Sequence, residues 1–408
     1  MVQHETTRRG ICRMLAGTAG AAVMPRWAGA ETAAVFPDWK EGNLDIHHIC
    51  TGRSESTLMV LPDGTTMLID AGDITGERPE PTILPVTPDT SRTPAEWIAA
   101  YIDRFLKPLN RASPAVDYAL MSHFHNDHIG GRRLDGVRMA HGYALSGITE
   151  VAEHIPIKKL VDRGYPDYAF PSRKATAASN PHFFDDYLAF VTHQREQRGM
   201  AAEGFTVGTT AQFALRHAPG RYPGFKIENI AANGRVGENA IFPTPDENTC
   251  SCAIKLTYGA FAYYTGGDLG GFSAKRDMET PVAAAVGRVD AMKLNHHGYV
   301  DSANPAFVAA LRPRVMTVIA WDDDHPRRET FTRMTDKTIY PDERLIYTTG
   351  MHATVAERLG AENVAMFRPR GHVVIRVADG GASFLVFVLD PKSFAVLDDT
   401  GILPAHLS

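Results

Sequence analysis

The densest group of potential metal ligands in the chain lies between residues 122 and 131, in the order Ser-His-Phe-His-Asn-Asp-His-Ile-Gly-Gly. His123 and His125 are two residues apart, so an extended chain points both imidazoles to one side, where they can hold one ion. Asp127 and His128 follow where the chain can curl, and they can present a second pair of ligands. Imidazole and carboxylate ligands without a thiolate suit Zn²⁺, Mn²⁺ or Fe. The spacing therefore predicts a metal site.

The pattern His-x-His-x-Asp-His after an apolar strand resembles the metallo-β-lactamase superfamily. Two later motifs fit this resemblance: Asp268 matches the carboxylate that bridges two metal ions, and His296-His297-Gly298 matches the last histidine motif. Asp70 resembles an early aspartate of the family, which supports the ligands without binding metal. The resemblance implies two divalent ions, Zn with Mn or Fe as alternatives, and a full set of metal ligands comprising His123, His125, Asp127, His128, Asp268 and His297.

The sequence does not separate the roles of the two adjacent histidines. His297 is favoured as the ligand because it directly precedes a glycine turn, and His296 would then face the substrate as a proton donor or phosphate contact. The opposite assignment stays open. In the family, two ions about 3.5–4 Å apart share a hydroxide, the nucleophile. The resemblance implies that Asp127 orients this hydroxide, so the expected catalytic residues are Asp127 and His296.

Within the superfamily, the stretches 52–72, 248–268 and 293–313 are most similar to the competence-type DNA-uptake hydrolase domains and to phosphorylcholine esterase. The Gly-Gln-Gly-Asp element of the uptake domains is replaced here by Gly-Arg-Ser-Glu at 52–55. The middle-motif histidine of β-lactamases has no clear counterpart, since His182 and His217 are expected to be surface or packing residues. This branch commonly lacks that ligand, which argues against β-lactamase activity. Lys293 and Arg53 are candidate cations for stabilising the charge that develops on the substrate, but each is expected to be a solvated charge at a strand end.

These motifs favour a hydrolase that uses a metal-bound hydroxide, with a phosphodiesterase acting on a small nucleotide or phospho-headgroup as the first hypothesis. The alternative is a lactone, ester or β-lactam hydrolase of the same fold. Aromatic residues in the middle of the chain would suit its apolar substrate, although core packing explains them equally well: Tyr165, Tyr168, Phe170, Phe183 and Phe184. A third possibility is a metal-binding module without catalysis. A redox site is disfavoured because the motif has histidine where diiron oxygen reductases have glutamate.

Several elements must position these residues. Apolar alternation predicts strands at 44–50, 57–61 and 66–69, the last two joined by a Pro-Asp-Gly turn. Thr93-Pro94-Ala95-Glu96 has the pattern of a capping box and predicts a helix with one buried face. The apolar strand 118–121 leads directly into the first histidine motif. Further strands are expected at 253–257, 261–265, 289–294 and 315–321, and a second hairpin at 373–377 and 384–389.

The composition of the chain changes between about 132 and 245, where predicted helical segments alternate with aromatic and proline-rich stretches. We interpret this region as an insertion that decorates the core with helices and loops. Strands and helices otherwise alternate in two halves, which fits a layered α/β or α+β arrangement around one site. The resemblance makes this a four-layered αββα sandwich. One domain is expected over 31–408.

The first 30 residues have the features of a twin-arginine export signal, with Arg8-Arg9, a weakly apolar stretch and Ala28-Gly29-Ala30 as a cleavage site. The mature protein is therefore expected to be periplasmic or secreted. This segment has a net charge of +3, which leaves −8 for the remainder of a chain of net charge −5. Because nucleic acid is held mainly by Lys and Arg, extended nucleic-acid binding is not expected, and a small-molecule substrate is favoured. No stretch is apolar enough to span a membrane, and one disulfide is possible among Cys50, Cys250 and Cys252.

Overall fold

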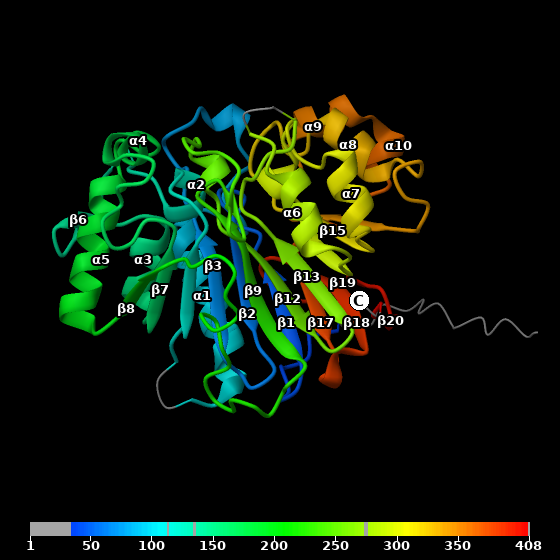
Figure 1. The fold of residues 1–408 in the computed structure, drawn as a ribbon, viewed down its shortest axis with the longest axis horizontal. Coiled ribbons are helices and arrows are strands. Elements are labelled where there is room, and N and C mark those ends of the chain that lie inside the picture. The colour runs from blue at the N-terminus through cyan, green and yellow to red at the C-terminus, as the bar shows by residue number, and fades with distance from the viewer. Residues whose placement is uncertain (1–33, 112–113, 134–135, 273–275, 407–408) are drawn as a thin grey trace, which may run out of the picture.

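The computed structural model describes residues 34–111, 114–133, 136–272 and 276–406, so the predicted export signal at 1–30 lies outside the described residues. Two large sheets form the centre of the molecule (Figure 1). The larger sheet has, in spatial order, β19 (Val396–Asp399), β18 (Ser383–Leu389), β17 (His372–Val377), β1 (Leu44–His48), β2 (Ser56–Val60), β3 (Thr66–Ala71), β4 (Tyr118–Met121), β7 (Lys159–Asp162) and β8 (Ala201–Gly204), and β20 (Leu403–Pro404) pairs with β18.

The second sheet has the order β11 (Asn239–Ala240), β10 (Arg235–Val236), β9 (Phe225–Ala232), β12 (Ala253–Tyr258), β13 (Phe261–Thr265), β14 (Ala291–Lys293), β15 (Val315–Val318) and β16 (Leu345–Thr348). A small separate hairpin joins β5 (Met139–Ala140) to β6 (Tyr143–Ala144). Both large sheets are mixed: the hairpins predicted at 57–69 and 373–389 pair antiparallel, whereas β3 with β4 and β13 through β16 pair parallel. The expected strands are confirmed, with ends that differ by a few residues.

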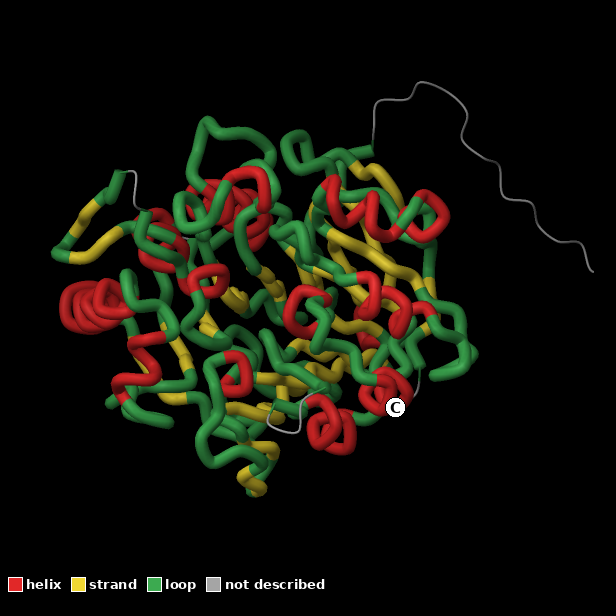
Figure 2. Tube along the Cα trace, turned by 90° about the horizontal axis from the view of Figure 1, so that it is seen from above, coloured by secondary structure: helices red, strands yellow, loops and turns green. Residues whose placement is uncertain are grey.

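Helices cover the outer faces of both sheets (Figures 1 and 2). Against the first sheet lie α1 (Pro94–Leu106), α3 (Gly147–His154), α4 (Arg173–Ala178) and α5 (Phe184–Arg198). On the side of the second sheet lie α6 (Glu279–Val286), α7 (Pro305–Leu311), α8 (Arg328–Thr335), α9 (Ala353–Leu359) and α10 (Ala361–Val364). The short α2 (Asn126–Ile129) follows β4 directly. The result is an α+β sandwich, as predicted.

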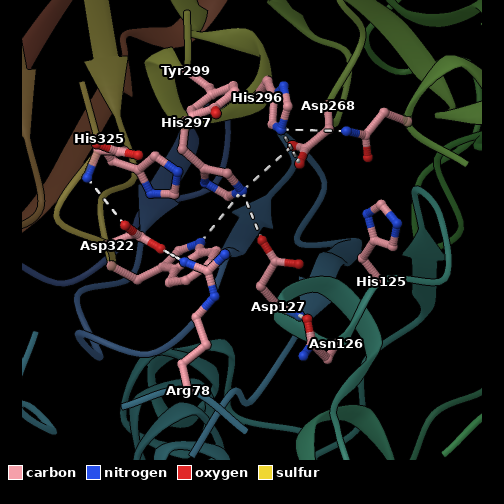
Figure 3. A pocket seen from close by; sticks show the side chains of 13 residues that line it. Arg78, His125, Asn126, Asp127, Asp268, His296, His297, Tyr299, Asp322 and His325 are labelled. Carbon is pink, nitrogen blue, oxygen red and sulfur yellow. Dashed lines mark hydrogen bonds and ion pairs between the residues drawn. The ribbon is translucent and has the colours of Figure 1, made fainter. Parts of the chain in front are cut away.

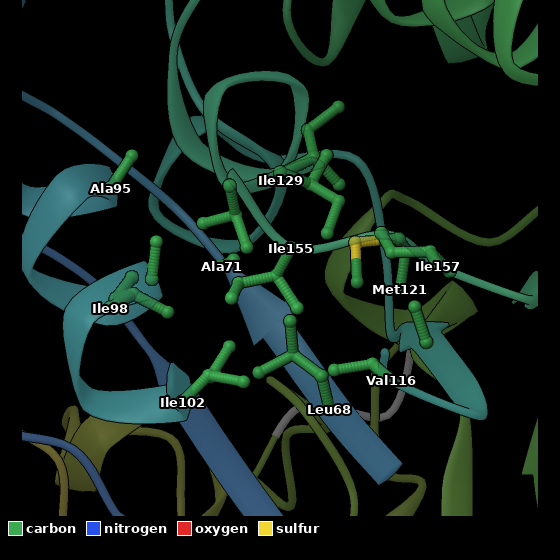
Figure 4. Packing of buried hydrophobic residues seen from close by; sticks show 14 of the residues in the cluster. Leu68, Ala71, Ala95, Ile98, Ile102, Val116, Met121, Ile129, Ile155 and Ile157 are labelled. Carbon is green, nitrogen blue, oxygen red and sulfur yellow. The ribbon is translucent and has the colours of Figure 1, made fainter. Parts of the chain in front are cut away.

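The alternation of apolar residues in the strands separates the core into layers. In β3, Leu68 packs outward against the helices, while Met67 and Ile69 pack inward between the two sheets. Figure 4 shows the outer layer, where Ile98 and Ile102 of α1 lie over Leu68. Full burial of each such side chain stabilises the fold by about 1.5–3 kcal/mol. A third cluster packs the outer face of the second sheet against α6 to α9.

The predicted capping box at the start of α1 is confirmed. Thr93 Oγ1 accepts a hydrogen bond from the backbone N–H of Glu96 at 3.1 Å, and Glu96 Oε2 accepts one from the N–H of Thr93 at 2.9 Å. These bonds satisfy two donors that the helix itself leaves unpaired. The start of this helix is therefore fixed locally, while its position on the sheet comes from the apolar face.

The stretch 132–245 is more deeply integrated than the expected decoration. It supplies β7 and β8 to the first sheet and β9 to the second, where β9 pairs with β12 over the length of the strand. Its aromatic residues Phe183, Phe184 and Tyr168 are buried in the layer between the first sheet and its helices. This region therefore builds part of both sheets.

Cys50, Cys250 and Cys252 are buried and free, so the disulfide considered from the sequence is not formed among the described residues. Burial raises the pKa of the Cys50 thiol to about 12. The part of the chain that the structure describes contains no helix of sufficient length and apolar character to cross a membrane.

Candidate metal centre

The parallel pairing of β3 with β4 brings Asp70 beside the first histidine motif. Asp70 Oδ1 accepts the backbone N–H of Ser122 at 2.7 Å, and Oδ2 accepts the hydroxyl of Ser122 at 2.6 Å. Oδ2 also lies 2.8 Å from Nδ1 of His128. This bond fixes the imidazole and turns its Nε2 toward the centre of the site. Asp70 thus has the supporting position expected for it.

His123 and His125 lie on one side of the Asp268 carboxylate. His123 is fully buried, with Nε2 3.0 Å from Nδ1 of His125 and 3.9 Å from Asp268 Oδ2. Between the two histidines, the backbone N–H of Phe124 donates to Glu247 Oε1 at 2.8 Å. The buried side chain of Arg163 forms an ion pair with the same carboxylate. Glu247 and Arg163 therefore fix the turn that carries both imidazoles, a role that the sequence analysis missed.

Asp127, His128 and His297 lie on the other side of Asp268. Nε2 of His297 is 3.0 Å from Asp127 Oδ2 and 3.4 Å from Asp268 Oδ1. Nε2 of His128 is 3.3 Å from the same oxygen of Asp268. The outer nitrogen of His297, Nδ1, lies 2.9 Å from the carbonyl oxygen of Ile319. Each imidazole is thus held by its Nδ1 and directs its Nε2 to one point.

The adjacent His296 faces the first side of Asp268 and the open pocket. Its Nε2 lies 3.8 Å from Asp268 Oδ2, and its Nδ1 lies 2.6 Å from Asp301 Oδ1. Both histidines have left-handed backbone conformations, with φ of 48° and 52°. Two successive residues in this region cost free energy, so the surrounding contacts must hold the turn. The turn places the two imidazoles on opposite oxygens of one carboxylate.

The donor set fits a divalent metal ion. Four residues offer ligand atoms within 4.8 Å of one another: Glu55, His128, Asp268 and His297. Asp268 Oδ1 is buried without a hydrogen bond of normal geometry, which a cation would satisfy. His123, His125 and Asp127 adjoin this group through the contacts above, so the structure brings together every ligand expected from the sequence. Nitrogen and oxygen donors of this kind suit Zn²⁺, Mn²⁺ or Fe.

The pKa shifts at the site are those of a buried cluster whose carboxylates must be balanced by positive charge. Burial opposes the charge on His128, but the carboxylates of Asp268 and Asp127 raise its pKa well above the ordinary value. Against the same opposing burial, Asp268 and Asp127 raise the pKa of His297 to about 9. Burial and the neighbouring His128 hold the pKa of His123 well below its usual range. The two carboxylates therefore retain protons on two imidazoles unless another cation takes their place.

Glu55, which belongs to the element that departs from the uptake-domain pattern, was not expected at this site. Its carboxylate Oε2 lies 2.5 Å from Nζ of Lys293 and 3.5 Å from Nδ1 of His297, and all three side chains are buried. The prediction that Lys293 is a solvated charge is therefore wrong. The same prediction for Arg53 is wrong too, because its buried guanidinium forms a two-point ion pair with Glu80.

Neither histidine considered for the middle motif reaches the centre. Nε2 of His217 lies 3.1 Å from Oδ2 of Asp117, the residue before β4, so His217 links its own loop to the first sheet. His182 lines a separate surface pocket beside α5. Both are outside the cluster, as expected for surface or packing residues. On the first side of Asp268, the third imidazole is that of His296.

The cluster forms the floor of a polar pocket of about 360 Å³ (Figure 3). The walls carry hydrogen-bond donors and acceptors, the rings of a tyrosine and a tryptophan, and no aliphatic side chain. The residues that line the pocket are Arg78, His125, Asn126, Asp127, Asn248, Asp268, His296, His297, Tyr299, Trp321, Asp322, Asp324 and His325. This volume is in the range of small-molecule sites. None of the aromatic residues considered for an apolar substrate lines it. The pocket therefore suits a small polar ligand.

No protein-family model and no curated protein matches this chain. Among solved structures, it is similar to one named "Putative metal-dependent hydrolase" from Parabacteroides distasonis ATCC 8503, with a TM-score of 0.36 and 13% identity over 77% of this chain and 97% of that chain. It is also similar to a protein of unknown function from Enterococcus faecalis V583, with a TM-score of 0.30 and 11% identity over 81% of this chain and 76% of that chain. Likenesses at this level assign no function, so the proposal below rests on the geometry of the site.

Proposed function

We propose that this protein is a metal-dependent hydrolase that cleaves a small phosphodiester. The observation that carries the proposal is the buried carboxylate of Asp268, which has imidazoles on both of its oxygens at the floor of a polar pocket. One ion would be held by His123, His125 and Asp268, and a second by Asp127, His128, His297 and Asp268. Bound there, the ions would act as Lewis acids and lower the pKa of coordinated water toward about 7.

The residues of the chain provide the remaining catalytic functions. Asp127 lines the pocket and is held by His297, so it can orient the attacking water. His296 is partly exposed to the pocket, and Asp301 fixes its Nδ1 so that Nε2 faces the substrate space. An imidazole paired in this way can donate a proton to the leaving oxygen. Asp301 is a positioning residue for this step, and Asn248 contacts Nε2 of His296 at 3.3 Å.

A phosphodiester fits the pocket better than an apolar ester or lactone does. Arg78, Asn248 and Tyr299 line the pocket, and their donor groups suit the charged oxygens of a phosphate. None of the aromatic residues that would have favoured an apolar substrate lines the pocket: Tyr168, Phe183 and Phe184 are buried in the core, Tyr165 is half-buried against it, and Phe170 is exposed elsewhere. This removes the support for the alternative lactone, ester or β-lactam substrate.

The experiment compares hydrolysis of bis-p-nitrophenyl phosphate, p-nitrophenyl butyrate and nitrocefin by protein of measured metal content. We expect turnover of the phosphodiester alone, abolished in Asp127→Ala and Asp268→Ala. Asp342→Ala is the matched control, because Asp342 pairs with Arg312 at the surface and should be dispensable. Turnover of the ester or of nitrocefin without the phosphodiester would replace this proposal with the lactone or ester alternative.

We also propose that the protein is exported by the twin-arginine route, which carries folded proteins with their metal in place. Support comes from the sequence alone, through Arg8-Arg9 and the Ala28-Gly29-Ala30 site. Cell fractionation of the wild type and of a variant with both arginines changed to lysine tests this. Retention of the variant in the cytoplasm is expected, and equal export of both proteins would refute the twin-arginine route.

A further inference from the structure

One wall of the pocket is built by residues outside the two histidine motifs that form the candidate metal centre. Arg78, from the loop after β3, meets Trp321, Asp322 and His325, from the loop after β15; we call these four residues the Arg78 wall. In Figure 3 Asp322 and His325 lie on the opposite side of the pocket from His125, and the guanidinium of Arg78 reaches Asp322. An inference about this wall rests on the proposed function, because it concerns the part of the substrate next to the scissile group.

Contacts within the described part of the chain fix the guanidinium of Arg78 but engage only one of its nitrogens, Nη1. Nη1 forms an ion pair with Oδ2 of the buried Asp322, and the guanidinium carbon lies 5.2 Å from the ring centre of Trp321. The side chain is 49% exposed, and Nε and Nη2 have no recorded partner among the described residues. A guanidinium held in this way offers its remaining N–H groups as a preorganised planar fork. Such a fork matches the paired oxygens of a carboxylate or phosphate.

The two acidic residues of the loop after β15 that line the pocket, Asp322 and Asp324, are already engaged. Asp324 pairs with Arg327 at 2.5 Å and with Arg358 at 3.0 Å. Asp322 Oδ1 accepts the backbone N–H of Asp324 at 3.1 Å, while its other oxygen binds Arg78. No carboxylate of the wall is therefore left to neutralise a cationic group, and the pairing leaves Arg78 as the charged group with free donors.

The aromatic surface of the wall is occupied as well. Arg78 lies over Trp321, and the rings of His325 and His297 meet it edge to face, at 4.8 and 5.7 Å between centroids. Recognition of a quaternary ammonium group requires an open aromatic face. The wall thus disfavours a choline-like substituent, although the sequence resemblance pointed partly to a phosphorylcholine esterase.

We propose that Arg78 is a specificity-determining residue that binds a second anionic group of the substrate, while the scissile phosphate lies on the metal centre. The substrate would then be a small phosphodiester with a carboxylate or phosphate on the substituent that points to the Arg78 wall. A pocket of about 360 Å³ accommodates such a molecule. Substituents that end in a neutral or cationic group would leave the free donors of Arg78 unmatched.

The first test uses p-nitrophenyl phosphodiesters that differ only in the end of the second alkyl substituent: carboxylate, phosphate, hydroxyl or trimethylammonium. We expect wild-type kcat/KM to be about tenfold or more higher for an anionic end than for the hydroxyl or trimethylammonium end, mainly through KM. The ratio between the carboxylate and phosphate ends identifies which anion is preferred. Arg78→Gln should abolish the preference, and Arg78→Lys should keep part of it because the charge remains without the planar fork.

Arg368→Gln is the matched control, since Arg368 also pairs with an aspartate, Asp398, and does not line the pocket. It should leave the preference unchanged. A preference that survives in Arg78→Gln, or a wild-type preference for the trimethylammonium end, would overturn the proposal.

A binding measurement separates this inference from the proposed function. Calorimetric titration of the metal-loaded protein compares phosphonoacetate, which carries two anionic groups, with methylphosphonate, which carries one. We expect tighter binding of phosphonoacetate by the wild type and loss of the difference in Arg78→Gln. If no phosphodiester is hydrolysed but this difference is present, the proposed function fails while the anion site stands. Equal binding of the two ligands by the wild type would overturn the anion site itself.

Discussion

The buried ion pair between Glu55 and Lys293 allows a quantitative prediction about the support of the metal centre. Glu55 Oε2 and Lys293 Nζ are 2.5 Å apart, and each side chain is 1% exposed. Nζ also donates to the carbonyl oxygen of Gly267 at 2.8 Å, directly before the buried carboxylate of Asp268. Glu55→Gln keeps the size of the side chain and an oxygen acceptor but removes the negative charge. The ammonium group then stays buried without a full counter-charge.

The expected cost follows from this geometry. At 2.5 Å and an effective dielectric constant of about 20, the gross attraction is about 7 kcal/mol, most of which offsets desolvation of the two charges. Breaking a buried pair by removing one partner costs about 3–5 kcal/mol. Because Gly267 still accepts a hydrogen bond from Lys293, we expect the lower end, a loss of about 3 kcal/mol in the free energy of unfolding.

The assay is urea unfolding of metal-free protein, so that loss of metal does not contribute to the result. Glu55→Gln, Lys293→Met and the double variant form a cycle, and the double variant should recover a large part of the stability lost in Glu55→Gln. Glu41→Gln is the control, because its pair with Arg221 is exposed and should contribute little. A loss below about 1 kcal/mol in Glu55→Gln, or strict additivity in the cycle, would refute the view of a coupled buried pair.

Three further predictions concern the centre. Asp70→Asn removes a carboxylate that holds Nδ1 of His128, so metal affinity measured by equilibrium dialysis should fall about 10- to 100-fold, and unchanged affinity would contradict this supporting role. Because the pKa of His297 is raised to about 9 and that of His128 well above its ordinary value, metal binding at pH 7.5 should displace a proton from each imidazole. Titrations in buffers of different ionisation enthalpy should show this release, and the apparent affinity should fall about a hundredfold per pH unit as pH decreases below 9, because two protons compete with the metal. Gly72→Ala places a Cβ 1.9 Å from the backbone oxygen of Asp127 and should lower the melting temperature and metal content, whereas Gly136→Ala, which meets no atom of the described residues within 4 Å, should change neither.

The sequence alone predicted the features that depend on neighbouring residues. The strand 118–121, the two hairpins and the capping box at Thr93 are confirmed, because alternation, turn composition and cap spacing act over a few residues. The cluster of His123, His125, Asp127 and His128 was identified in the same way, from one short segment at a strand end. Their roles as metal ligands stay a prediction, but the structure places them together.

The partners of these residues could not be found by local spacing. Glu55 and Lys293 are 238 positions apart and had been considered separately, as a departure from a family pattern and as a solvated charge. Arg78 meets Asp322 only because the loops after β3 and β15 face each other across the two sheets. Glu247 likewise reaches the backbone between the two histidines that follow β4, and it does so from a loop before β12. Arg78 and Glu247 have no distinctive sequence neighbourhood.

The order of the strands in the two sheets determined which of these distant residues come into contact. The region 132–245 looked peripheral because its composition differs from its surroundings, yet β7, β8 and β9 join both sheets. Local patterns determine which segments become strands and which face each strand buries, since period and turn chemistry are properties of consecutive residues. Which strands become neighbours depends on burial of the whole apolar surface, and that is a property only of the folded chain. The sequence therefore identified the segments that carry the candidate ligands, whereas the tertiary structure decided which charges support them and which side chains form the walls of the pocket.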